Sequence, residues 1–138
     1  MKIVFMGTPA FAAFFLESLL KTPHEIACVV TQPDRPAGRG RVLTPPPVKE
    51  VALAAGIPVL QPDDLKSEEF ENALREYQAD LFVVVAYSIL PKKILTLSRL
   101  GALNVHGSLL PKYRGAAPVQ RAIATGQLQN GISAFVLD

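Results

Sequence analysis

The first 21 residues, MKIVFMGTPAFAAFFLESLLK (1–21), predict a buried strand that runs directly into a buried helix. Residues 1–6 are mostly apolar, as expected of a strand covered on both faces of a sheet. The apolar run then stops; Thr8 can cap a helix, and Pro9 suits the first turn of one. Residues 10–21 are apolar on nearly every side of a helix, which implies heavy burial. A strand and a helix that are both buried this deeply indicate a layered α/β arrangement.

The same alternation of strand and helix continues along the chain. Further strands are expected at 25–31, 58–61, 80–87, 101–106 and 131–138, and helices at 48–56, 67–77, 91–97 and 117–126. The helix at 67–77 is amphipathic, with Phe70, Leu74 and Tyr77 at positions i, i+4 and i+7. Residues 32–47 are rich in proline and glycine and are expected to form a long loop. Continuous apolar strands that alternate with helices indicate an α/β fold with a doubly wound, mostly parallel sheet.

The composition is that of one globular domain: 138 residues, of which 49% are hydrophobic and 19% charged. The net charge of +2 is modest, so affinity for a polyanion must come from local clusters of charge. Cys28 is the single cysteine, which excludes an internal disulfide and a cysteine-based zinc site, and its apolar neighbours indicate a core residue. Because the N-terminus does not resemble a signal peptide and no apolar stretch reaches membrane-spanning length, a cytoplasmic location is expected.

The ends of the expected strands indicate where a ligand would bind. In doubly wound sheets, ligands bind beyond the carboxyl ends of the strands, near the point where the strand order reverses. Here that singles out residues 7–11, 87–91 and 106–115. A dinucleotide site is not indicated, because the first turn has one glycine instead of three and no acidic residue ends the second strand. Gly7 either helps to shape a pocket or only permits a tight turn, and the sequence leaves both interpretations open.

Asn104 and His106 stand two positions apart in one expected strand, so their side chains project to the same side, about 6–7 Å apart. His106 can carry a proton near neutral pH, and Asn104 can donate a hydrogen bond to an oxygen that gains negative charge. The pair suits attack of an amine on a carbonyl or formyl carbon. The alternative is a histidine that ends a strand and bonds to the backbone. A metal site is not expected, because the only other histidine is His24, in an expected surface turn.

The residues around this pair, NVHGSLLPKYRGAAPVQ (104–120), resemble the signature of the folate-dependent formyltransferases, Asn-x-His-x-Ser-Leu-Leu-Pro followed by Arg-Gly. Three further stretches resemble the members of that family that act on methionyl-tRNA: GTPAFA (7–12), TQPDRPAGRG (31–40) and PPPVK (45–49). The resemblance implies a Rossmann-like formyltransferase domain. It also implies transfer of a formyl group from 10-formyltetrahydrofolate to the amino group of methionine on initiator tRNA, in translation initiation. Asn104 and His106 fall on the catalytic Asn and His of the family.

By the same resemblance, residues 86–90 form the loop that receives the pteridine of the folate. Its backbone groups are expected to bond the pterin edge, between apolar walls from Ile89 and Leu90. Family members often have Tyr/Phe-Gly-x-Ile-Leu-Pro here, whereas this chain has Ser88 in place of Gly-x and is one residue shorter. The full set expected to bind folate is Ala86, Tyr87, Ser88, Ile89, Leu90, Ser108, Leu109, Leu110 and Pro111. On the bare sequence, a strand end with a proline stop explains the loop equally well.

Residues 31–49 concentrate positive charge, with three arginines and Lys49 against one acidic residue, Asp34. Such a segment can contact phosphates, although without the resemblance a solvated surface is the better explanation of it. The resemblance favours contact with the acceptor arm of tRNA, led by Arg39 and Arg41. The full set expected to bind substrate or tRNA is Gly7, Thr8, Pro9, Phe11, Arg35, Arg39 and Arg41.

Two features of the family are not matched. Its catalytic aspartate lies a few residues beyond the last expected strand, in a segment that resembles Asp-x-Gly-Leu-Asp-x-Gly, and Asp138 matches only the first aspartate. The smaller C-terminal β-barrel domain of the family also has no counterpart. The chain is therefore expected to be the N-terminal part (1–138) of the catalytic domain, and the activity of this part alone is left open. A monomer is expected.

Two other functions stay open on the sequence. One is a different reaction of the same family: formyl transfer to a sugar nucleotide or a purine precursor, or hydrolysis of formylfolate. The proline-rich basic segment argues against these reactions, since a small substrate does not need it. The other is a non-catalytic module that binds folate or RNA.

Overall fold

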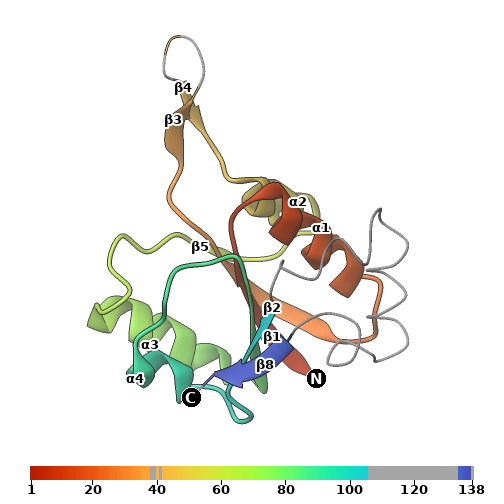
Figure 1. Cartoon of the computed structure of the whole chain (residues 1–138), viewed down its shortest axis with the longest axis vertical. Coiled ribbons are helices and arrows are strands. Elements are labelled where there is room, and N and C mark those ends of the chain that lie inside the picture. The colour runs from red at the N-terminus through yellow and green to blue at the C-terminus, as the bar shows by residue number, and fades with distance from the viewer. Residues whose placement is uncertain (38–39, 41, 106–133, 138) are drawn as a thin grey trace.

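The computed structural model describes residues 1–37, 40, 42–105 and 134–137. Its centre is a six-stranded sheet, built from β1 (Lys2–Gly7), β2 (Glu25–Val30), β5 (Val59–Leu60), β6 (Leu81–Val85), β7 (Ala102–Val105) and β8 (Ala134–Leu137). The order is β5-β2-β1-β6-β7-β8, so the chain first builds outward on one side of β1 and then crosses to the other (Figure 1). The strand order therefore reverses between β1 and β6.

The strands from β5 to β7 in this order pair in parallel, and β8 pairs antiparallel with β7. The six strands that the sequence predicted form this main sheet, and the prediction of a mostly parallel sheet is confirmed. The helix expected at 117–126 lies outside the described residues, as does the end of the strand expected at 101–106.

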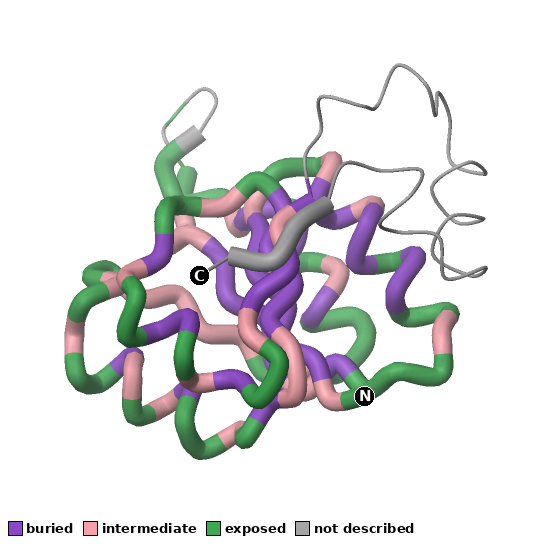
Figure 2. The backbone as a smooth tube through the Cα atoms, turned by 60° about the horizontal axis from the view of Figure 1, so that its bottom comes forward, coloured by how far each residue is buried: buried purple, intermediate pink, exposed green. Residues whose placement is uncertain are grey.

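Helices cover both faces of the sheet. On one face lie α1 (Ala10–Leu19) and α2 (Pro47–Ala54), and on the other α3 (Glu68–Tyr77) and α4 (Lys92–Leu95), as Figure 1 shows. Neighbouring residues of β1 contribute to different cores: Phe5 packs with Phe15 of α1, with ring centroids 6.5 Å apart, whereas Met6 belongs to the cluster that includes Leu74 of α3. Figure 2 shows the buried strands in the middle and the exposed residues on the outer turns. The doubly wound prediction is confirmed.

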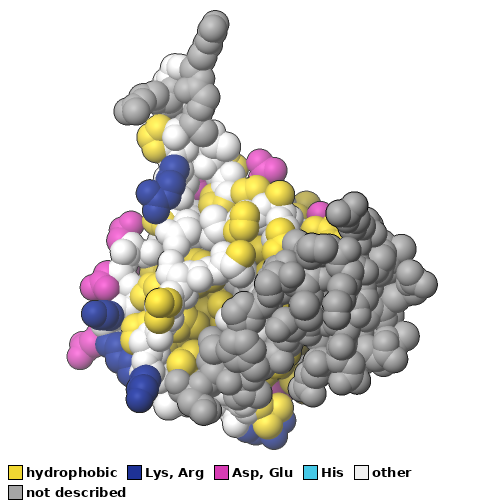
Figure 3. Space-filling view, in the orientation of Figure 1, with side chains coloured by type: hydrophobic (Ala, Val, Ile, Leu, Met, Phe, Trp, Pro, Cys, Tyr) yellow, Lys and Arg dark blue, Asp and Glu magenta, His cyan; other side chains and the backbone are white. Residues whose placement is uncertain are grey.

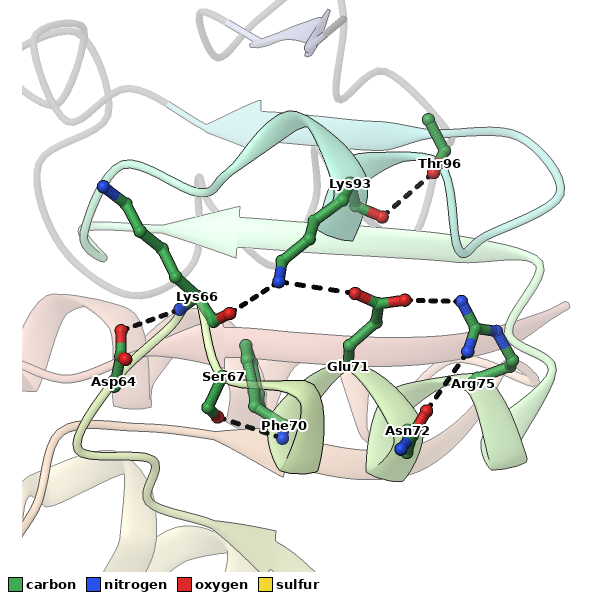
Figure 4. A network of polar contacts seen from close by, with 9 residues as sticks. All are labelled: Asp64, Lys66, Ser67, Phe70, Glu71, Asn72, Arg75, Lys93 and Thr96. Carbon is green, nitrogen blue, oxygen red and sulfur yellow. Dashed lines mark hydrogen bonds and ion pairs between the residues drawn. The ribbon is translucent and has the colours of Figure 1, made fainter.

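Helix α3 shows why its prediction from sequence succeeded. Ser67 caps it by accepting a hydrogen bond from the backbone N–H of Phe70 at 3.2 Å, and Phe70 and Leu74 are its buried residues. The acidic residues of the first turn complement the positive end of the helix dipole. A network of polar side chains then joins α3 to α4 on the outside (Figure 4).

The segment expected to be a loop contains a β-hairpin, formed by β3 (Arg35–Ala37) and β4 (Val42–Thr44). Its antiparallel strands form a separate two-stranded sheet that projects away from the main sheet in Figure 1. The prediction of a loop without strands is wrong. The proline at position 36 concealed the strand, because proline cannot donate to a β ladder and is confined to edge strands, and both strands of this hairpin are edges.

Candidate active site

The carboxyl ends of β1, β2, β6 and β7 meet at one edge of the sheet. There the hydroxyl of Thr8 accepts hydrogen bonds from the hydroxyl of Thr31 and from the backbone N–H of Gln32, each at 3.3 Å. Thr8 therefore ties the end of β1 to the end of β2. The expectation that Thr8 caps helix α1 is wrong: Pro9 is the N-cap residue and makes no side-chain cap bond. The hydroxyl bonds across the sheet edge instead.

A pocket of about 410 Å³ opens at the same edge, beside β6 and β7. It is lined by Val84, Tyr87, Ser88, Ile89, Leu90, Lys92, Leu95 and Asn104. Asn104 is half-buried in β7 and pairs in register with Val84 of β6, which places its side chain beside the loop that follows β6. The sequence had singled out Asn104 and residues 86–90 separately, and the fold brings Asn104 and residues 87–90 together around one pocket, whereas Ala86 does not line it.

Residues 86–90, which we call the pocket loop, leave β6 through a left-handed turn at Ala86, where φ is 50°. Burial raises the pKa of the Tyr87 phenol to about 12, so its hydroxyl stays protonated and can donate a hydrogen bond. Leu90 is buried in the core, whereas the side chain of Ile89 is 96% exposed while it lines the pocket. Of the two expected apolar walls, Leu90 forms the floor and Ile89 stands at the rim. The lining of the pocket therefore combines apolar side chains with the polar side chains of Tyr87, Ser88, Lys92 and Asn104.

The base of the hairpin is held by a cluster of polar side chains. The ammonium of Lys49 in α2 lies 3.0 Å from the carboxylate of Asp34, and the side-chain amide of Gln61 donates to the same carboxylate at 2.7 Å. The hydrogen bond from Gln61, followed by that from Lys49, lowers the pKa of Asp34 below its ordinary value. Figure 3 shows a patch of positive charge at the base of the hairpin and hydrophobic side chains on the face below it. The positive charge of Lys49 is paired with Asp34 inside the protein.

The structure places the other predicted site residues in different settings. Gly7 closes β1, and Phe11 of α1 packs against the core. Arg35 begins the hairpin and donates to the side chain of Gln32 at 3.3 Å. The remaining predicted residues lie outside the described part of the chain: Arg39, Arg41, His106, Ser108, Leu109, Leu110 and Pro111.

Sequence reasoning missed two contributors to this edge. Lys92 lines the pocket and places a cation at its mouth, and Gln32 joins the pocket loop to the hairpin. Lys92 lies one residue beyond the stretch expected to bind ligand, directly after Pro91, so only its proximity to that stretch marks it. Gln32 belongs to the quoted TQPDRPAGRG motif, but its amide bears no charge that would have drawn attention to it.

Among the residues that the structure describes, no three His, Cys, Asp or Glu side chains gather closely enough to hold a metal ion. Within the same residues, no helix has the length and apolar character needed to cross a membrane. Cys28 is fully buried, and burial raises the pKa of its thiol to about 11, which confirms it as a core residue.

Three comparisons place the chain among known proteins. It is 55% identical over its whole length to the methionyl-tRNA formyltransferase of Desulfotalea psychrophila and 54% identical over 96% of its length to that of Moorella thermoacetica. It spans 43% of the length of each of these relatives. The phosphoribosylglycinamide formyltransferase of Anaplasma phagocytophilum has a similar structure, with a TM-score of 0.50 and 25% identity over 91% of this chain and 57% of that one. The sequence model of the family described as formyl transferase matches residues 1–138, and the chain therefore belongs to the formyl transferase family.

Proposed function

We propose that the protein transfers a formyl group from 10-formyltetrahydrofolate to the amino group of methionine on initiator tRNA. The observation that carries this proposal is the identity of 52–55% with four relatives, each a methionyl-tRNA formyltransferase, over 96–100% of this chain. The structural relative that acts as a phosphoribosylglycinamide formyltransferase is much less similar, at 25% identity. The balance of similarity therefore favours tRNA over a purine precursor as the acceptor.

The pocket suits the folate donor in size and character. Its volume of about 410 Å³ lies within the range of roughly 300–1,000 Å³ typical of small-molecule sites. In this proposal the flat pteridine lies over the buried side chain of Leu90, with Ile89 of the rim closing over it and the pocket-loop backbone bonding its polar edge. Lys92 at the mouth attracts the carboxylates of the folate.

The chemistry centres on Asn104. The amine of methionine attacks the formyl carbon, and the carbonyl oxygen becomes an oxyanion as the new C–N bond forms. The amide of Asn104 donates a hydrogen bond to that oxygen, which stabilises the charge as it develops. His106 takes a proton from the attacking amine, and the bond from carbon to N10 then breaks as N10 gains a proton.

Contact with tRNA is assigned to the hairpin and to the residues at the end of β1. Arg35, Arg39 and Arg41 supply positive charge for phosphates of the acceptor arm, and Gly7, Thr8, Pro9 and Phe11 lie at the edge where the methionyl end must enter. Phe11 acts in this proposal through the packing of α1, because its side chain contacts the core. A monomeric state and a cytoplasmic location stay predictions of the sequence.

The test is formylation of methionyl-tRNA by the intact protein with 10-formyltetrahydrofolate. Asn104→Ala is expected to lower kcat by about 10²–10³, the usual effect of losing one oxyanion donor, and His106→Ala is expected to lower it strongly with the fold intact. Binding of 5-formyltetrahydrofolate, an isomer of the donor, separates a catalytic loss from a lost pocket.

The matched control is Asn72→Ala, which removes the same amide from α3, where it bonds only to Arg75 in the described structure. This variant should formylate at the native rate. Full activity of Asn104→Ala would remove Asn104 from the mechanism. Formylation of phosphoribosylglycinamide in preference to methionyl-tRNA would replace the proposed function itself.

A further inference from the structure

Gln32 bonds to three segments that are remote in sequence and to the hairpin that begins three residues after it. Its backbone N–H donates to Thr8 at the end of β1 at 3.3 Å, and its backbone carbonyl accepts from the side chain of Gln61 at 3.0 Å. Its side-chain amide donates to the hydroxyl of Ser88 in the pocket loop at 2.8 Å and accepts from the guanidinium of Arg35 in the hairpin at 3.3 Å. Every polar group of this half-buried residue is therefore engaged.

The two side-chain bonds define the orientation of the amide. A guanidinium can only donate, so the amide oxygen must face Arg35 and the NH₂ group must face Ser88. If the amide turned over, its NH₂ group would oppose the donors of Arg35. Gln32 thus links the hairpin to the pocket loop through a single rigid planar group.

The link is specific to the sequence of this loop. The bond needs the hydroxyl oxygen of Ser88 as its acceptor, and a residue without a side-chain oxygen at this position could not accept it. Ser88 is separated from Gln32 by 56 residues, so the contact depends on β2 and β6 both ending at the same edge of the sheet. Among the described residues, Gln32 is the one hydrogen-bond partner of the Ser88 side chain.

We propose that Gln32 is a positioning residue that couples the pocket loop to the hairpin, so that folate in the pocket and tRNA at the hairpin strengthen each other's binding. This inference rests on the proposed function. A ligand that orders the pocket loop holds Ser88, and through Gln32 it holds Arg35 in the position that meets the tRNA. Because coupling between two sites is reciprocal, tRNA must raise the affinity for folate by the same factor.

The experiment measures the Kd of the intact protein for 5-formyltetrahydrofolate with and without saturating initiator methionyl-tRNA, and the Kd for that tRNA with and without the folate. For each ligand, the coupling factor is the Kd measured without the other ligand divided by the Kd measured with it. Gln32→Met keeps the length and volume of the side chain but removes both hydrogen bonds. It is expected to lower the coupling factor about three- to tenfold, as the loss of one or two hydrogen bonds would, and to change each separate Kd much less.

Three further variants test the link itself. Ser88→Ala removes the acceptor, so as a single change it should lower the coupling factor, and it should lower that factor little further when added to Gln32→Met. Because Ser88 also lines the pocket, this variant is judged by the coupling factor and not by its separate Kd for folate. Gln32→Glu retains an oxygen for Arg35 and a second that accepts from the Ser88 hydroxyl, so it should restore coupling. Gln61→Ala is the matched control. It removes the hydrogen bonds from Gln61 to the backbone carbonyl of Gln32 and to Asp34 but leaves the bonds of Gln32 to Ser88 and Arg35 in place, so coupling should persist.

A coupling factor of one in the native protein, or an equal factor in the native protein and in Gln32→Met, overturns the inference while both ligands still bind. A native protein that binds neither ligand overturns the proposed function instead. The two failures are therefore distinguishable.

Discussion

Gly7 is a residue whose lack of a side chain is required by space. A Cβ atom at this position would lie 2.6 Å from the carbonyl oxygen of Val85 in β6 and 2.7 Å from the Cβ of Ala12 in α1. Its φ is not in the left-handed region, so conformational freedom is not the reason for glycine here. The sequence left open whether Gly7 shapes a pocket or permits a tight turn. The close packing accounts for the glycine without a tight turn, and a role of Gly7 in substrate binding stays a prediction.

Gly7→Ala is therefore expected to lower the free energy of unfolding by about 1–3 kcal/mol, as overpacking does where a backbone atom cannot move aside. Urea denaturation followed by circular dichroism measures it. In an Ala12→Gly background the clash with the Cβ of residue 12 is absent, so Gly7→Ala should lower the free energy of unfolding by a smaller amount there. The clash with the carbonyl of Val85 remains, so some loss of stability should persist. An unchanged or higher stability of Gly7→Ala would show that β6 and α1 can separate freely.

Glu71 connects two elements, α3 and α4. Its carboxylate lies 2.6 Å from the guanidinium of Arg75 in the same helix and 3.5 Å from the ammonium of Lys93 in α4, which also donates to the backbone of Lys66 (Figure 4). The hydrogen bond from Arg75 is the main cause that lowers the pKa of Glu71, and the bond from Lys93 adds to it.

Glu71→Gln should therefore lower the free energy of unfolding at pH 7, and the effect should shrink in acid. Because the folded pKa is lowered, the stabilisation is complete above the ordinary pKa of glutamate and is lost as the pH falls through the folded pKa. Urea titrations of both proteins at pH 7 and at pH 3 measure this difference. Glu76→Gln, which removes an exposed carboxylate from the last turn of the same helix, is the control that should show no such loss. A difference that is as large at pH 3 as at pH 7 would contradict an ionic role.

The hairpin projects away from the main sheet of the molecule (Figure 1). Its base is anchored by the ion pair of Asp34 with Lys49 and by the hydrogen bond between Arg35 and Gln32. In the proposed function this arm contacts tRNA phosphates, so the loss of one such contact should weaken tRNA binding and leave the affinity for folate alone unaffected. Arg39→Ala is expected to raise the KM for methionyl-tRNA, to reduce the slope of log affinity against log salt by about one, and to leave folate affinity unchanged.

The measurement is steady-state formylation by the intact protein at several salt concentrations, with folate binding measured separately. Lys21→Ala removes one exposed positive charge that follows α1 and should change neither quantity. Equal loss of tRNA and folate affinity in Arg39→Ala would show that the hairpin is not a dedicated tRNA contact.

The sequence by itself determined where the strands of the main sheet and the described helices lie along the chain, because burial leaves a local periodic pattern. The apolar runs at 1–6 and 80–87, and the spacing of Phe70 and Leu74, each record how their own element is covered. The signature around Asn104 was also readable, since its residue types and spacings lie within one short stretch. These properties need no knowledge of distant segments.

Only the tertiary structure decided which strand ends meet. The order of the sheet brings Asn104 to the pocket loop and places Gln32 within hydrogen-bonding distance of Ser88, 56 residues away. It likewise decided that Thr8 bonds across the sheet edge and that proline at position 36 stands in a strand. Hydrogen bonds between remote segments leave no local pattern in a sequence, because each partner is an ordinary polar residue until the fold brings the two together.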